Sequence, residues 1–214
     1  LATLSTWGAG LLLQKQNAQR KDADKAAQAE RGAPSFTRFM TEREREMTES
    51  VLVSANPPEH VFLGGYKEAE RTLLYFMPDW MEAPPDTDAS PLACLRASYA
   101  ASYGSLSHRD ILGALTALGI ERDTVGDILV SEGSVDIIVL REVLPFLLQN
   151  FTDAGRVHLS VKEISQDGLT VPEQKYVEVK DTVPSMRLDC ILSAGFSMSR
   201  EKAAELIKAG RVTL

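Results

Sequence analysis

Six segments decide the fold of this 214-residue chain: LACLRASY (92–99), SHRDILGALTALG (107–119), ILV (128–130), VDIIVL (135–140), LPFLLQNF (144–151) and VHLSVKEI (157–164). Two of them carry apolar residues at helical spacing, namely Ile111, Leu112, Leu115 and Leu118, and then Leu144, Leu147, Leu148 and Phe151. The other four have the short apolar or alternating pattern of strands. The order is β-α-β-β-α-β, which predicts a ferredoxin-like domain over residues 86–165.

Outward from this stretch, the sequence predicts an N-terminal helical region with a small strand unit over residues 1–85. A polar helix is expected at 11–31 and a charged one from Thr41 to about Ser50, with Thr41 and Glu44 as a capping box. Short strands are expected at 61–63 and 72–77. Residues 166–185 are polar and predict a linker, and residues 186–214 predict two short helices over 186–194 and 199–209. The fold class expected is α+β.

Charge is unevenly distributed along the chain. The formal net charge is −7, but residues 51–185 carry −10 and residues 186–214 carry +2. A basic end on an acidic body is a known pointer to nucleic-acid binding by that end. The longest apolar runs fall far short of the ~20 residues that span a bilayer, and two cysteines far apart in sequence suit a reducing compartment. We therefore expect a cytoplasmic protein without a membrane partner.

The last helix carries cations where a helix normally favours acids. Ser199 can cap this helix, which places Arg200 and Lys202 in its first turn, at the positive end of the helix dipole. A bound phosphate would make these positions favourable, because helix N–H groups and basic side chains would then act together. A solvated helix with Glu201 and Glu205 balancing the charge is the alternative.

Two motifs in this region form a recognisable pattern. Arg187-Leu188-Asp189 is followed by Ser199-Arg200, then Ile207, Gly210 and Val212, and this pattern resembles the first half of the S-four-type RNA-binding domain. The resemblance implies a C-terminal αα module that is truncated in this chain. It also implies RNA-contacting residues, for which we take Arg187, Ser199, Arg200, Lys202, Lys208 and Arg211. Asp189 is expected to orient Arg187 or to cap the first helix.

A second resemblance runs from about Ser35 to the last residue. It rests on the motifs TRFMTERE (37–44), GGY (64–66), AER (69–71) and SHRDILGALTALGIER (107–122), which together are similar to the YlmH family of bacterial RNA-binding proteins. This resemblance implies binding of ribosomal RNA on the large ribosomal subunit, close to tRNA, during rescue of stalled translation. The alternative is a protein-interaction or assembly factor, of the cell-division or photosystem-assembly type, with the basic module as a tether.

The sequence gives little support for catalysis. His108-Arg109-Asp110 is like the start of a kinase catalytic loop, but the required Asn five residues later is Leu115. His108 and Arg109 are expected at a helix start capped by Ser107 or Asp110, where they contact RNA phosphate or form a local ion pair. His60, His108 and His158 are too scattered for a metal motif. We therefore expect a non-enzymatic protein with no cofactor, no metal and no small-molecule substrate.

Overall fold

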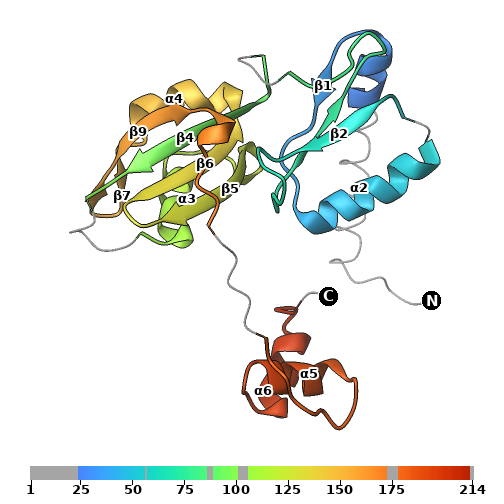
Figure 1. Cartoon of the computed structure of the whole chain (residues 1–214), viewed down its shortest axis with the longest axis vertical. Coiled ribbons are helices and arrows are strands. Elements are labelled where there is room, and N and C mark those ends of the chain that lie inside the picture. Colours follow the sequence, from blue (N-terminus) through green and yellow to red (C-terminus); the bar gives the residue numbers. More distant parts are fainter. Residues whose placement is uncertain (1–23, 56, 86–88, 101–105, 173–177, 213–214) are drawn as a thin grey trace, which may run out of the picture. The chain divides into compact units, whose positions relative to one another are not determined.

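The computed structural model describes residues 24–55, 57–85, 89–100, 106–172 and 178–212. The described residues up to Pro172 form one compact unit, and those from residue 178 onward belong to a second. Both helices and antiparallel sheets are present (Figure 1), so the expected α+β class is confirmed. Within the described ranges, no helix has the length and apolar content needed to cross a membrane.

The central element of the first unit is a four-stranded antiparallel sheet. Its strands lie in the order β5-β6-β4-β9, with bounds Val125–Ser131, Ser134–Leu140, Leu92–Ser98 and Ser160–Ile164. Helix α3 (His108–Ala117) connects β4 to β5, and helix α4 (Leu144–Asn150) follows β6. The chain therefore follows the β-α-β-β-α-β order that the sequence predicts.

Helix α3 begins at a complete capping box. The Ser107 hydroxyl accepts a hydrogen bond from the Asp110 backbone N–H at 3.3 Å, and the Asp110 carboxylate accepts one from the Ser107 N–H at 2.9 Å. Of the two caps that the sequence allows, Ser107 is therefore the N-cap. Gly119, at φ +81°, follows the helix in the left-handed conformation that glycine adopts readily.

One strand of this unit differs from the prediction. The prediction of one continuous strand over residues 157–164 is wrong, because β8 (Val157–His158) pairs with β7 (Asp153–Ala154) in a separate two-stranded hairpin. The Leu159 N–H then donates to the Thr152 carbonyl at 2.7 Å, and β9 begins only at Ser160. The alternating pattern is continuous in sequence, but the hydrogen-bond partner changes midway.

The N-terminal part contains a three-stranded sheet in the order β1-β3-β2, with bounds Ser35–Phe36, Leu73–Phe76 and His60–Leu63. Strand β1 was not expected from the sequence. Helix α2 (Glu42–Ala55) continues beyond the expected end at Ser50, and the Thr41–Glu44 capping box forms as predicted. Residues 24–30 are helical and Arg31 lies in a turn, while residues 11–23 of the helix expected at 11–31 lie outside the described residues.

The two sheets of this unit share one hydrophobic core. Its buried members are Phe39, Leu73, Tyr75 and Met77 from the N-terminal part and Leu92, Cys94, Ile138 and Leu140 from β4 and β6. Gly126 makes close approach possible, since a Cβ atom there would lie 2.8 Å from the Phe39 ring. The packing therefore continues across the boundary expected between residues 85 and 86.

The buried carboxylate of Asp127 links the N-terminal part to β5 by hydrogen bonds. Asp127 accepts hydrogen bonds from the Tyr66 hydroxyl at 2.9 Å and from the backbone N–H groups of Glu70 and Arg71. The Arg71 guanidinium in turn donates to the Val125 carbonyl at 3.0 Å. The GGY and AER motifs of the sequence therefore serve to attach the N-terminal sheet to β5.

The first residues of the expected linker lie on the four-stranded sheet. Arg96 on β4 makes two hydrogen bonds of 2.6 Å to Asp136 on β6 and donates to the Gly168 carbonyl and the Thr170 hydroxyl. The Thr170 N–H completes the arrangement by donating to Asp136 at 2.7 Å. Residues 168–170 are thus attached to the first unit by hydrogen bonds.

Candidate nucleic-acid interface

The second unit holds most of the predicted contact residues on two short helices, α5 (Leu188–Gly195) and α6 (Arg200–Lys208). The helices pack through the buried side chains of Cys190 and Ala203. Ser199 caps α6 as predicted, because its hydroxyl accepts a hydrogen bond from the Lys202 backbone N–H at 3.2 Å. Arg200 and Lys202 are therefore in the first turn and exposed, where the dipole favours an anion.

Asp189 connects the two motifs of this unit. One of its carboxylate oxygens accepts a hydrogen bond from Arg187 Nε at 3.0 Å, and the other accepts one from Arg200 Nη2 at 2.9 Å. The hydrogen bond from Arg187, followed by that from Arg200, lowers the pKa of Asp189 to about 2. The carboxylate therefore stays charged at neutral pH and holds two guanidinium groups close together.

The two arginines keep donors for another ligand. Side-chain exposure is 71% for Arg187 and 54% for Arg200, against 13% for Asp189. Each guanidinium has five N–H donors in a planar fork, and each gives only one to Asp189. Two exposed cations around one carboxylate leave a net positive charge of the kind that binds phosphate.

The other two predicted cations of the second unit lie at the C-terminal end of α6. Lys208 is in the last turn, and Arg211 follows Gly210, whose φ is +65°. The backbone N–H groups of Gly210 and Arg211 donate to the carbonyls of Ile207 and Leu206, which is a Schellman ending. A helix of nine residues is about 13 Å long, so the predicted residues form two groups rather than one.

His108 and Arg109 belong to the first unit, where both side chains are exposed in the first turn of α3. Sequence reasoning identified Asp189 as a partner of Arg187 but not of Arg200. The Arg200–Asp189 contact depends on how the two helices pack, and eleven residues separate the pair in sequence.

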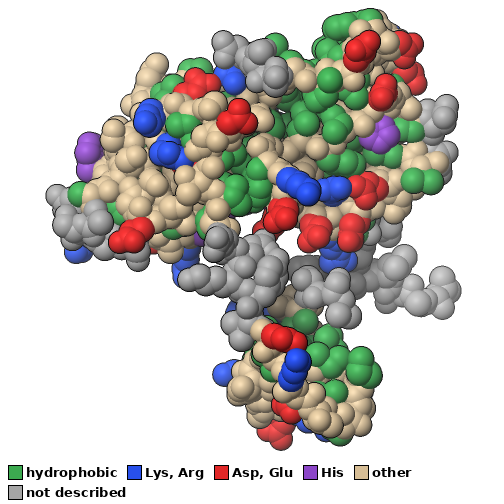
Figure 2. All heavy atoms as spheres, viewed as in Figure 1, with side chains coloured by type: hydrophobic (Ala, Val, Ile, Leu, Met, Phe, Trp, Pro, Cys, Tyr) green, Lys and Arg blue, Asp and Glu red, His purple; other side chains and the backbone are tan. Residues whose placement is uncertain are grey.

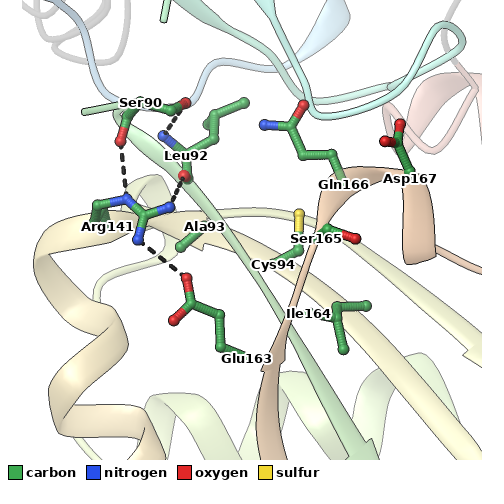
Figure 3. Close-up of a pocket in the computed structure, with 10 residues that line it drawn as sticks. All are labelled: Ser90, Leu92, Ala93, Cys94, Arg141, Glu163, Ile164, Ser165, Gln166 and Asp167. Carbon is green, nitrogen blue, oxygen red and sulfur yellow. Dashed lines mark hydrogen bonds and ion pairs between the residues drawn. The ribbon is translucent and has the colours of Figure 1, made fainter. Parts of the chain in front are cut away.

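A cavity of about 530 Å³ lies beside β4 and β9 in the first unit (Figure 3). Arg141 on its wall donates to the carbonyls of Ser90 and Leu92 and to the Glu163 carboxylate. Burial raises the pKa of the Cys94 thiol on its floor to about 12, so this thiol is protonated at neutral pH. With Arg141 paired and Asp167 also present, the cavity offers no excess positive charge for a phosphate.

Among the residues that the structure describes, no cluster of three His, Cys, Asp or Glu side chains could hold a metal ion.

Comparison with known proteins shows which family of domains the four-stranded sheet and its helices resemble. A family model described as "Putative RNA-binding domain in YlmH" matches residues 85–167, which span the four-stranded sheet and its helices. The class defined by fold and site is thus an α+β protein with a domain of that type and a small basic two-helix unit.

The particular family follows from a curated relative. The chain is 34% identical over 178 residues to the "Ribosome-associated protein quality control protein P2" of Bacillus subtilis (strain 168), a match that covers 83% of this chain and 68% of that protein. The chain belongs to the YlmH family. Its fold is also similar to that of "Cell division protein ylmH from Streptococcus pneumoniae", with a TM-score of 0.55 and 22% identity, covering 77% of this chain and 94% of the other.

Proposed function

We propose that this protein binds ribosomal RNA of the large ribosomal subunit and acts, without catalysis, in the quality control of stalled translation. The observation that carries the proposal is the arrangement in which Asp189 holds Arg187, at the start of α5, and Arg200, at the start of α6, close to each other. The matched RNA-binding family model and the ribosome-associated name of the Bacillus relative support it.

Electrostatics explain how an acidic chain can bind RNA. The net charge of −7 disfavours bulk attraction to a polyanion, whereas the +2 on residues 186–214 is concentrated on a small surface. Weak non-specific binding together with a local cationic site favours a partner that is recognised by the shape of its backbone at one place. A folded ribosomal RNA offers such places, with tRNA close by. Binding of this kind needs no small-molecule substrate and no cofactor.

Charge reversal at the start of α6 tests the proposal. In the full chain, Arg200→Glu with Lys202→Glu should weaken co-sedimentation with purified bacterial ribosomes. It should also lower the slope of log K against log salt by roughly 0.7–0.9 per lost phosphate contact. Glu201→Lys with Glu205→Lys is the matched control and should not weaken binding. Unchanged affinity and slope in the first variant would refute the assignment of these residues.

The acidity of residues 51–185, which carry −10, favours a second candidate function. In this alternative the first unit binds a protein, and the basic unit is only a tether. Ribosome association that survives nuclease digestion of exposed RNA would favour the alternative, whereas loss of association would favour RNA binding.

A further inference from the structure

One aromatic side chain of the second unit lies open to solvent. Phe196, at the C-terminal end of α5, is 69% exposed, which makes it the most exposed of the seven phenylalanines of the chain. The next most exposed is Phe146 on α4 of the first unit, at 43%. A single exposed apolar side chain is common on protein surfaces, so the surroundings of Phe196 decide whether it has a role.

Helix geometry places Phe196 on the side of α5 that carries Asp189. The two residues are seven positions apart, close to two full turns, so their side chains project from the same side of the helix. Phe196 keeps the helical spacing, because its backbone N–H donates to the Leu192 carbonyl at 3.0 Å. At a rise of about 1.5 Å per residue, Phe196 lies about 10 Å along the axis from Asp189. Since Asp189 holds Arg187 and Arg200, the ring and the two guanidinium groups belong to one side of the unit.

The turn that presents Phe196 is held by hydrogen bonds. The Ser193 hydroxyl donates to the Met198 carbonyl at 2.6 Å, and the Met198 N–H donates to the Ser193 carbonyl at 3.1 Å. Ser197, just before Met198, has a φ of +49° and is the one non-glycine residue with a positive φ in the described part of the chain. The ring is therefore carried by a defined turn, which leads directly into the Ser199 cap of α6.

The charges around this ring suit a nucleic acid. Residues 190–199 carry no charged side chain. The two helix starts on either side of this stretch carry three cations and two acids, namely Arg187, Arg200 and Lys202 with Asp189 and Glu201. Figure 2 shows hydrophobic side chains on the same visible face of the second unit as basic and acidic ones. An uncharged aromatic surface beside an excess of cations is the combination with which proteins bind single-stranded nucleic acid.

We propose that Phe196 stacks on a base of an unpaired RNA segment, one phosphate of which is bound by Arg187 and Arg200. This inference rests on the proposed function and specifies the class of RNA that the second unit binds. Bases in loops, bulges and ends of RNA are free to stack on aromatic side chains, whereas bases inside a helix are stacked on their neighbours. Every base has a π face, so the ring selects an accessible base and not a sequence.

Substitutions of Phe196 in the full chain test the stacking contact, by co-sedimentation with purified bacterial ribosomes over a salt series. Phe196→Ala should weaken binding about tenfold, which is the scale of one stacked base. The slope of log K against log salt should stay unchanged, because stacking releases no counterion. Phe196→Tyr keeps a ring and should bind as the unchanged protein does. Phe196→Leu keeps an apolar side chain without a ring and should lose as much affinity as Phe196→Ala.

The pattern of losses separates stacking from an apolar contact with a protein. Full binding by Phe196→Leu would indicate such a contact and would overturn the inference, as would full binding by Phe196→Ala or a lower salt slope in that variant. Phe146→Ala is the matched control and should bind normally, whereas an equal loss in this control would refute the assignment to Phe196. Thermal melts identify a loss caused by unfolding, in which case the comparison of Phe196→Leu with Phe196→Tyr decides.

The proposed function is tested separately from this inference. If Arg200→Glu with Lys202→Glu weakens ribosome binding and Phe196→Ala does not, the proposed function stands and the stacking contact is wrong. If neither variant weakens binding, both proposals fail. Ultraviolet crosslinking of the full chain to ribosomes should join residues 193–199 to unpaired nucleotides. Crosslinks of this segment to nucleotides inside RNA helices, or none from this segment, would overturn the class of RNA proposed.

Discussion

Replacing Arg96 with leucine should destabilise the first unit more than replacing Arg96 and Asp136 together. The Asp136 side chain is 1% exposed and accepts two hydrogen bonds of 2.6 Å from Arg96 and one of 2.7 Å from the Thr170 N–H. Arg96→Leu leaves a buried carboxylate with only the Thr170 contact among those described. Breaking a buried ion pair by removing one partner costs about 3–5 kcal/mol.

The double variant provides the matched comparison. Replacing a buried ion pair by apolar residues of similar volume is often close to neutral, so Arg96→Leu with Asp136→Leu should cost about 1 kcal/mol. Urea unfolding followed by circular dichroism at neutral pH measures the free energy of unfolding of both variants. The two values are compared only if the free energy falls with urea concentration at the same slope in both variants. If the single and double variants lose the same free energy of unfolding, the two side chains are not coupled and the argument from burial is wrong.

Three further predictions concern a glycine, a cysteine and a carboxylate. Gly126→Ala should destabilise by about 1–3 kcal/mol in urea unfolding because its Cβ would meet the Phe39 ring, whereas Gly113→Ala, with no atom within 4 Å, should not destabilise. Cys94, with its thiol pKa raised to about 12, should not react with Ellman's reagent at pH 8 until the protein unfolds; fast native labelling in a variant lacking the other cysteine would contradict this. The Asp189 carboxyl should titrate in NMR near pH 2 instead of its ordinary 3.8. Its contribution to the stability of the second unit is therefore complete above about pH 4 and is lost as the pH falls through 2. A titration midpoint near 3.8 would mean that the guanidinium contacts are absent in solution.

The sequence by itself determined the elements whose signals are local. The capping residues Thr41, Ser107 and Ser199 were identifiable because a cap involves only the first turn of its helix. The same holds for Gly210, which ends α6 with a positive φ. The β-α-β-β-α-β order was predictable because strand and helix periodicities are read along the chain. The domain boundaries and the RNA-contacting role of the cationic residues remain predictions.

Only the tertiary structure decided which segments meet across the chain. The alternation of apolar and polar residues over 157–164 could not reveal that β8 pairs with β7 while β9 pairs with β4. Periodicity indicates a strand but does not indicate which strand it pairs with. Nor could the pattern show that Asp189 also holds Arg200, or that the N-terminal sheet covers one face of the central sheet. These contacts join residues far apart in sequence, and packing of complementary surfaces selects them. Local propensity therefore determined the elements of this protein, whereas burial of shared apolar faces determined which surfaces remain available to a partner.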